Sequence, residues 1–502
     1  MGVKWIFPLL WVLLITQVVS CSSVGRKQTA KFRQLVKTGQ YKAASKMAHG
    51  EKFHSSKKSA LLRLIETGLV DHFAGYHHLS AQTFEKAREL GNKLFTVSIS
   101  KKIKTVIVDD TSDNYYPSMM VQSQIRFYLA LNYYLVSTQK NYLAQAVNDK
   151  KDESEQDWQD KLVATELSDV DRKNYLMKSR AILLEWDSLI KNFLSQFKGD
   201  PVFKNDMSHK LLGAIIHESV GTNIDRTIAK NLLLDAKKLL NRNYAMYDYF
   251  NLNNKKYISD FDTLHNLKES EFKKNYIAPT SRYHQLISYV DQQVKRLKSK
   301  KNRSNFSLIL QYGMVPAKVQ NVTYVPLPVT TGLSMSYTNI KLPKITRKNH
   351  LYDFSLEIQK KGSEKKELIP LVTMNPISSI VYREFTEELP GIQAKTIARF
   401  VTKQVAAAAS GVAATNTKGG VAAGFAVLSL ASTISQAVEQ ADTRQWSILP
   451  HEALLGRTYL DSGEYLVHLI SMKNGKELHR KLIKVATINS ETSNVLNIKI
   501  GD

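Results

Sequence analysis

Cysteine is almost absent from this chain, whose 502 residues contain one, Cys21. A single cysteine excludes an intramolecular disulfide and cannot by itself build a zinc site from thiolates. Glycine and proline are also sparse, at 22 and 12 residues, which excludes collagen-like and low-complexity chains. The hydrophobic fraction of 43% is ordinary for a globular chain. At roughly 100–200 residues per domain, the length predicts two to four domains.

The sequence also lacks the short motifs of common enzyme classes. It has no G-x-S-x-G, H-E-x-x-H, G-x-G-x-x-G or G-x-x-x-x-G-K-[ST] string. The S-x-x-K, S-D-N and K-T-G strings of penicillin-recognising enzymes occur, but K-T-G stands first, at Lys37–Gly39, where those enzymes have it last. His77 and His78 are adjacent, so on a helix they point about 100° apart and make a poor metal face. We therefore expect no enzyme activity, no cofactor and no metal site.

The N-terminus has the features of a secretion signal. An uncharged apolar run from Trp5 to Val19 is shorter than the ~20 residues that a spanning helix needs. We expect residues 1–20 to be a signal peptide. The only cysteine then follows the small residue Ser20, which resembles the bacterial lipobox, where the thiol is joined to diacylglycerol and the new amine is acylated. Cys21 is thus the predicted lipidation site, with 21–26 as a tether; the alternative is a free cysteine in an ordinary signal anchor.

Residues 27–300 have helical spacing and are rich in Ala, Leu, Lys and Gln. Gly68, Ser80, Phe84 and Ala87 follow one another at intervals of 12, 4 and 3 residues, which is the spacing of a tetratricopeptide unit. The small side chains would let two antiparallel helices approach, and Phe84 would fill the gap between them. A tetratricopeptide-like repeat domain is the prediction. A generic helical bundle is the alternative, because no strict period of roughly 34 residues is visible.

Residues 304–502 change to short strands separated by turns. Prolines at positions 326, 328 and 343 are interpreted as breaks between strands. We predict a small β-sandwich here, and therefore an α+β multidomain fold with the helical repeats first. Strands are expected at Phe306–Gln311, Val319–Val325, Asp353–Ile358, Tyr465–Ile470, Leu482–Ile488 and Asn494–Ile500.

A helical insertion at about 391–440 interrupts these strands. Its part from Val405 to Val438 is rich in Ala and Gly and carries one charge, Lys418. Gly420 and Gly424 are spaced as G-x-x-x-G, and small residues four apart let helices approach closely. One interpretation is a membrane-inserting or oligomerising helical hairpin. The other is a pair of helices packed against the β-sandwich.

The segment Gln440–Pro450, QADTRQWSILP, follows the insertion directly. Asp442, Arg444 and Trp446 could form a bidentate ion pair under an aromatic lid. The alternative is a structural corner, ending at Pro450, where the helix passes into a returning strand. No nucleophile–base pair stands nearby in the sequence to make this geometry catalytic.

Together these pieces resemble a little-characterised family of Gram-negative outer-membrane lipoproteins. That family has a tetratricopeptide-like N-terminal half and a C-terminal Ala/Gly-rich segment followed by Q-A-D-T-R-x-W-x-x-L-P, which Gln440–Pro450 matches. Further matches are the lipobox at Cys21, the helix Ala130–Tyr133, the turn Gly313–Pro316 and the strand entry Gly463–Val467. Members are often encoded beside lipoproteins that resemble activators of penicillin-binding proteins, so the resemblance implies a cell-envelope role.

The predicted function is a non-enzymatic, lipid-anchored scaffold or adaptor of the cell envelope. Lipid at Cys21 would hold it on the outer membrane, because Ser22 and Ser23 stand where inner-membrane lipoproteins carry aspartate. Its helical repeats would bind envelope proteins, such as other lipoproteins or cell-wall synthesis factors. The alternative is a membrane-associated, ring-forming assembly or secretion component that uses the Ala/Gly-rich segment.

The charge of the chain is one-sided. Its 70 Lys and Arg outnumber 45 Asp and Glu, for a net charge of +25. Nucleic acid is not expected as a partner, because the signal peptide directs the mature chain out of the cytoplasm and no basic motif interleaved with aromatics stands out. Anionic envelope polymers are candidate partners. Simple solubility from excess charge is the alternative.

Overall fold

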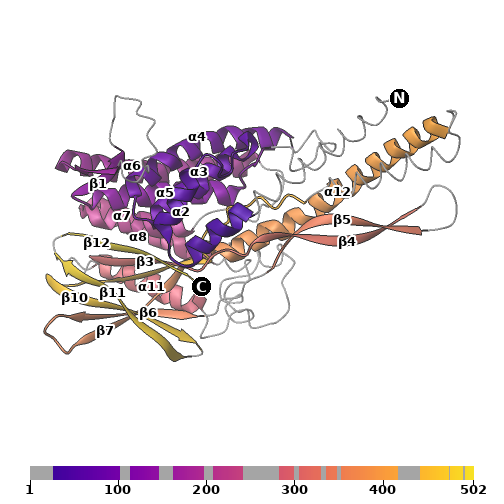
Figure 1. The fold of residues 1–502 in the computed structure, drawn as a ribbon. Helices are drawn as coiled ribbons and strands as arrows, with labels where there is room; N and C mark the ends of the chain where they lie inside the picture. Colours follow the sequence, from indigo (N-terminus) through magenta and orange to yellow (C-terminus); the bar gives the residue numbers. More distant parts are fainter. Residues whose placement is uncertain are drawn as a thin grey trace.

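The computed structural model describes residues 27–101, 114–145, 162–196, 207–240, 282–298, 305–328, 335–346, 352–415, 441–473, 475–489 and 492–501. The predicted signal peptide, Cys21 and the segment 416–440 with its Gly420–Gly424 pair lie outside these residues. The described chain is of mixed α and β type, with a helical first half followed by several small sheets (Figure 1).

The helical half is a series of antiparallel helices with one small hairpin of strands, which the sequence pattern did not predict. A helix over 27–37 comes first. The later elements are α2 (Tyr41–His49), the short 3-10 turn η1 (Lys57–Ser59), α3 (Ala60–Phe73), α4 (His77–Lys101), α5 (Met119–Ser137), β1 (Asn141–Gln145), β2 (Leu162–Glu166), α6 (Asp169–Gln196), α7 (Met207–Val220), α8 (Asn223–Leu239) and α11 (Arg282–Lys298).

Helix α5 forms the centre of this half. Most of its residues are apolar or aromatic, and each residue from Met119 to Val136 is buried, including the polar Gln122, Arg126 and Asn132. The Ser118 hydroxyl accepts a hydrogen bond from the backbone N–H of Val121 and so caps the first turn. Helices α4 and α6 pack along its two sides. This half is therefore built around a fully enclosed helix.

The β-rich half contains two four-stranded sheets and a separate two-stranded hairpin. The sheet orders are β11-β10-β6-β7 and β12-β3-β9-β8, with β12 and β3 parallel and the other pairs antiparallel. The elements are β3 (Phe306–Tyr312), β4 (Lys318–Pro328), β5 (Met335–Ile345), β6 (Asp353–Lys360), β7 (Lys366–Pro370), β8 (Val372–Asn375), α12 (Ile377–Thr415), β9 (Glu452–Thr458), β10 (Gly463–Lys473), β11 (Lys476–Ile488) and β12 (Asn494–Ile500).

Strand β3 shows how the layers are stacked. All seven of its residues are buried, because the sheet to which it belongs is covered on both faces. Leu308 and Leu310 join an apolar cluster shared with strands of the other four-stranded sheet. Ile309, between them, joins the core of the helical half. Helices, β12-β3-β9-β8 and β11-β10-β6-β7 thus form three successive layers (Figure 1).

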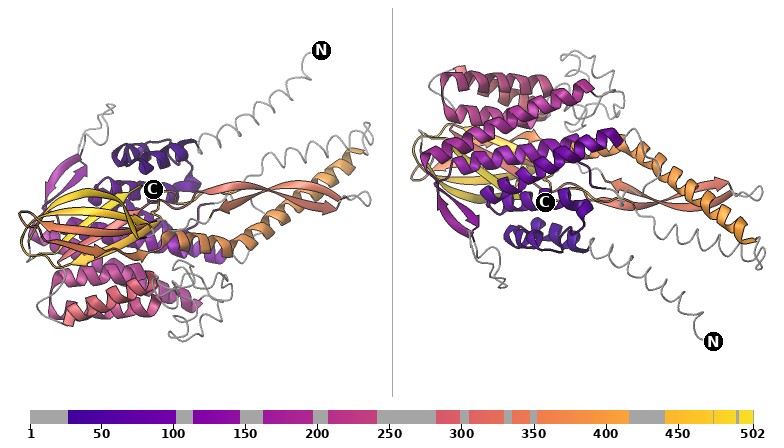
Figure 2. Two further views of the ribbon diagram at one scale, coloured as in Figure 1. Left: turned by 90° about the horizontal axis from the view of Figure 1, so that it is seen from below. Right: turned by 90° about the horizontal axis from the view of Figure 1, so that it is seen from above.

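An arm made of β4, β5 and α12 projects from this layered body (Figures 1 and 2). Helix α12 begins inside the body, where Ile377 and Ile380 are buried in the core, and then runs outward beside the β4–β5 hairpin. It starts well before residue 391, where the sequence placed the helical insertion, and it continues through Pro390 to Thr415. The described part of the Ala/Gly-rich segment is therefore the outer end of this helix.

The six predicted strands were found, β5, β7 and β8 were not predicted, and the role of the prolines was misinterpreted. Strands lie at each expected position, but β4 continues through Pro326 and Pro328, and β5 contains Pro343. These two strands pair only with each other within the described residues, so each keeps a free edge. A proline is tolerated there because its missing N–H can face away from the partner strand. No helix in the described ranges is both long enough and apolar enough to cross a membrane.

Candidate functional site at the junction of the two halves

The α3–α4 hairpin contains the four residues of the predicted repeat signature. A Cβ atom added at Gly68 would lie 3.1 Å from the ring of Phe84, so only glycine fits comfortably at this crossing. The Ser80 hydroxyl donates to the Gly68 carbonyl at 2.6 Å, and Ala87 is fully buried. The structure therefore brings Gly68, Ser80 and Phe84 into contact, with Phe84 filling the space that the glycine leaves.

Trp446 of the motif Gln440–Pro450 lies against this hairpin. Its ring is buried and stands 5.9 Å from the ring of Phe84 and 6.1 Å from that of Tyr128 on α5. The buried run continues through Pro450 to the start of β9. Two patterns found separately in the sequence, the repeat signature and the motif, therefore form one aromatic contact.

Asp442 and Arg444 form the expected bidentate ion pair. Arg444 donates from Nη2 to Asp442 Oδ2 at 2.8 Å and from Nε to Oδ1 at 3.0 Å. Its backbone N–H also donates to Oδ1 at 2.9 Å, which closes a tight turn. Both side chains remain partly exposed. Trp446 extends into the core behind this turn, so the pair and the ring belong to the same corner of the chain.

Two charged residues from the helical half hold the backbone of the motif. Glu66 of α3 is fully buried and accepts the backbone N–H of Ser447 at 2.6 Å. Arg33, in the helix over 27–37, donates to the Ser447 carbonyl and to that of Val315. Burial raises the pKa of Glu66 to about 7, although the hydrogen bonds from Ser447 and the charge of Arg33 oppose this rise. Sequence reasoning missed both residues; the one signal was a glutamate on an otherwise apolar face.

A second carboxylate, which is partly buried, connects the arm to the same place. Glu384 of α12 accepts hydrogen bonds from the Ser118 hydroxyl at 2.8 Å and the backbone N–H of Met120 at 3.2 Å. Burial raises the pKa of Glu384 to about 8, and the charge of Glu388 adds to the rise. Burial also raises the pKa of Tyr115, which interacts electrostatically with Glu66, Asp442, Arg444 and Glu384. We call these five residues, Tyr115 and its four charged neighbours, the junction cluster.

A network of neutral side chains joins the helices to the β12-β3-β9-β8 sheet. His72 Nε2 faces the amide nitrogens of Gln311 at 2.8 Å and Asn497 at 2.9 Å, while its Nδ1 lies 2.7 Å from the Asn132 carbonyl oxygen. These partners suit a neutral ring that carries its proton on Nδ1. Burial lowers the pKa of His72 to about 3, in agreement with that state. The halves are thus fastened by hydrogen bonds as well as by apolar contact.

A buried ion pair fastens the halves at another point. Arg457 of β9 and Glu218 of α7 approach to 2.7 Å, and both side chains are almost completely buried. Removing either partner would leave an uncompensated charge in the core, which costs about 3–5 kcal/mol.

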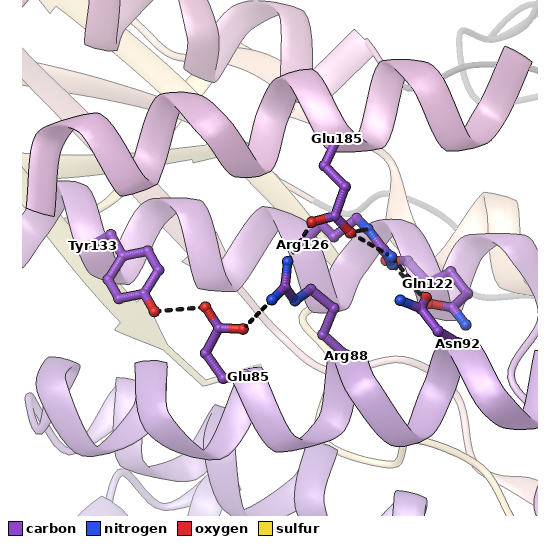
Figure 3. A network of polar contacts seen from close by, with 7 residues as sticks. All are labelled: Glu85, Arg88, Asn92, Gln122, Arg126, Tyr133 and Glu185. Carbon is purple, nitrogen blue, oxygen red and sulfur yellow. Dashed lines mark hydrogen bonds and ion pairs between the residues drawn. The ribbon is translucent and has the colours of Figure 1, made fainter.

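The helices α4, α5 and α6 are joined by a network around Arg126 (Figure 3). Arg126 is buried and donates to Glu185 at 2.9 and 3.1 Å, to Asn92 at 2.8 Å and to Gln122 at 2.7 Å. Arg88 connects Glu185 to Glu85, and Glu85 accepts the Tyr133 hydroxyl at 2.7 Å. Each acid in this network is paired with an arginine, so the geometry is that of a structural fastening between helices.

The other sequence motifs fall in ordinary structural positions. Lys37 ends the first helix, and Thr38 and Gly39 form the turn before α2, with Gly39 at φ +75°, a backbone conformation that favours glycine. His77 lies near Asn132, and desolvation lowers its pKa to about 4, whereas the ring centroid of His78 lies 4.1 Å from that of Tyr142. Within the described ranges no group of three His, Cys, Asp or Glu side chains is placed to hold a metal ion.

Comparisons of the chain with protein-family models, with curated proteins and with solved structures find no match in any of the three.

Proposed function

We propose that this protein is a non-enzymatic scaffold of the bacterial cell envelope, anchored to the outer membrane by lipid at Cys21. The observation that carries the proposal is that the motif Gln440–Pro450 has a structural role. Its Asp442 and Arg444 bind each other, and its Trp446 packs on Phe84. The ion pair thus shapes a turn of the chain, and the tryptophan joins the two halves into one body that carries an arm.

We further propose that the α3–α4 hairpin is a tetratricopeptide-like unit and that the two four-stranded sheets form a β-sandwich. The close approach of Gly68 to Phe84 supports the first assignment. The second is supported by the apolar cluster to which both sheets contribute side chains, including Leu308 and Val467.

The partner surface of the helical half would lie on α6, because the β12-β3-β9-β8 sheet covers the opposite face of the helices. Val170, Met177 and Leu184 are 66%, 61% and 67% exposed and stand seven residues apart. That spacing places them in one stripe along the helix. An apolar stripe of this kind fits a protein partner better than a polymer or a small molecule.

The test is co-purification from cross-linked cells. Deleting the helical half would expose the shared core, so the variant to use is Val170→Glu/Met177→Glu/Leu184→Glu. Ile224→Glu is the matched control, since Ile224 is an exposed apolar residue on another helix. Loss of a specific partner in the triple variant alone supports the proposal. An unchanged set of partners in both variants contradicts it.

A second candidate function is a membrane-associated assembly component that acts through the arm. The arm favours this candidate because α12 carries part of the Ala/Gly-rich segment away from the body. Carbonate extraction of a Cys21→Ser variant separates the two candidates. Release into the soluble fraction favours the scaffold, and retention in the membrane favours insertion.

A further inference from the structure

Strand β11 forms a long open edge of the outer sheet. It has 13 residues and pairs with β10 on one side, and no described strand pairs with its other side. The opposite edge of the same sheet, β7, has five residues and ends in Pro370. Backbone N–H and C=O groups on such an edge can accept a further strand. Length alone makes β11 the better template of the two.

The two faces of β11 differ in chemistry. Lys481 and Lys484 pair with Leu469 and Val467, both of which point into the apolar cluster between the sheets. A bulge at Ile483 keeps the two lysines on one face although they are three residues apart. Both are exposed at the rim of the core, and in the described part of the chain neither has an acidic partner.

The other face of the strand exposes apolar side chains. Leu482 and Val485 pair with His468 and Leu466, which point away from the inter-sheet cluster, and they are 47% and 49% exposed. Lysines and a bulge are common protection against unwanted strand pairing. The exposed side chains of Leu482 and Val485 on the opposite face do not protect against strand pairing. They offer apolar contact to an incoming strand.

A second copy of the chain would fit this edge poorly. Within the strand, Lys476, Arg480, Lys481 and Lys484 outnumber the single acid, Glu477. Antiparallel pairing of β11 with itself would continue each face into its copy and place lysine beside lysine. Like charges opposite each other in a sheet are destabilising. A strand that carries acidic residues would therefore complement the positive charge of β11 better than a second copy would.

We propose that β11 docks an extended protein segment whose side chains alternate between acidic and apolar residues, and that this segment adds to the sheet as a fifth strand. The acids would stand beside Lys481 and Lys484, and the apolar residues beside Leu482 and Val485. This site lies on the β-rich half, apart from the α6 stripe and from the lipid at Cys21, so it does not depend on the function proposed above.

The probe is a fluorescent peptide of four alternating Glu-Val pairs, titrated with the full-length protein and followed by anisotropy. Lys481→Glu/Lys484→Glu is the test variant. Lys52→Glu/Lys365→Glu is the matched control, because both of these exposed lysines lie outside β11. We expect the affinity to fall about tenfold or more in the test variant and to stay unchanged in the control. Unfolding curves of both variants confirm that they are folded.

Two backbone-methylated peptides distinguish strand addition from simple charge attraction. One carries N-methyl groups on its Glu residues and the other on its Val residues, and only alternate N–H groups of an added strand face β11. One of the two is therefore expected to lose binding while the other keeps it. Equal binding by both, equal binding by a Lys-Val peptide, or no binding of the Glu-Val peptide would each overturn the proposal.

Discussion

Replacing Glu66 with glutamine is expected to change how the stability of the protein depends on pH. Glu66 is fully buried in α3 and its carboxylate accepts the backbone N–H of Ser447. Burial raises its pKa from the ordinary 4.5 to about 7. The folded state therefore keeps a proton on this group between these two pH values, whereas the unfolded chain has released it.

The sign of the effect follows from this difference in bound protons. Between about pH 4.5 and pH 7 the folded state binds more protons than the unfolded state, so the free energy of unfolding falls as the pH rises. A shift from 4.5 to about 7, at about 1.4 kcal/mol per pKa unit, corresponds to a loss of about 3 kcal/mol across that window. Glutamine does not titrate, so position 66 of the variant contributes no such loss in the free energy of unfolding over this pH range. Relative to the wild type, Glu66→Gln should gain about 3 kcal/mol between pH 4 and pH 8.

The assay is urea unfolding at several pH values, read as the difference between variant and wild type at each pH. The difference is the useful quantity, because Glu384, with its pKa raised to about 8, adds a slope of the same sign to both proteins. Glu51→Gln, which removes an exposed carboxylate from the same half, is the matched control. A difference that stays constant within about 0.5 kcal/mol from pH 4 to pH 8 would refute the reasoning about Glu66.

Three further predictions concern the junction and the anchor. Trp446→Ala should lower the free energy of unfolding by about 3–5 kcal/mol, because it empties a fully buried site between the halves; a loss below about 1 kcal/mol in urea unfolding would contradict this. Gly68→Val should cost about 1–3 kcal/mol through its clash with Phe84, and Phe84→Leu should relieve part of that cost. Strictly additive effects in the double variant would show that the two residues do not interact. Cys21→Ser should abolish incorporation of radiolabelled palmitate in growing cells, and persistent labelling would place the lipid elsewhere.

Local patterns in the sequence were informative where neighbours along the chain determine the contact. Gly68 and Phe84 are close in sequence, and one helical hairpin is enough to bring them together. The strands β3, β6 and β12 were predicted at their observed starts from alternation and turn residues alone. The prolines of β4 and β5 were misinterpreted because their tolerance depends on whether a strand has a free edge. That property belongs to the sheet and cannot be read from one strand.

The residues of the junction were harder to foresee because their partners are distant in sequence. Glu66 and Ser447 are separated by 381 positions, and His72 and Asn497 by 425. A lone glutamate or histidine on an apolar helix face has no local feature that names its partner. The bidentate pair of Asp442 and Arg444 was one of two interpretations open from the sequence, because its members are two residues apart. The aromatic lid expected with it is absent from the pair, since Trp446 packs on Phe84 in the core.

The sequence by itself determined that a helical half precedes a strand-rich half, that two helices cross closely at Gly68 and that the chain turns at Asp442, since each follows from side chains within one or two elements. Tertiary structure alone decided that Trp446 packs on Phe84, that the carboxylate of Glu66 is buried, and that β11 pairs on one side alone among the described strands. The physical reason is that burial and pairing depend on which distant surfaces come together. The environment of a side chain is fixed only when that packing is complete. The pKa of the side chain and its contribution to the free energy of unfolding are fixed with it.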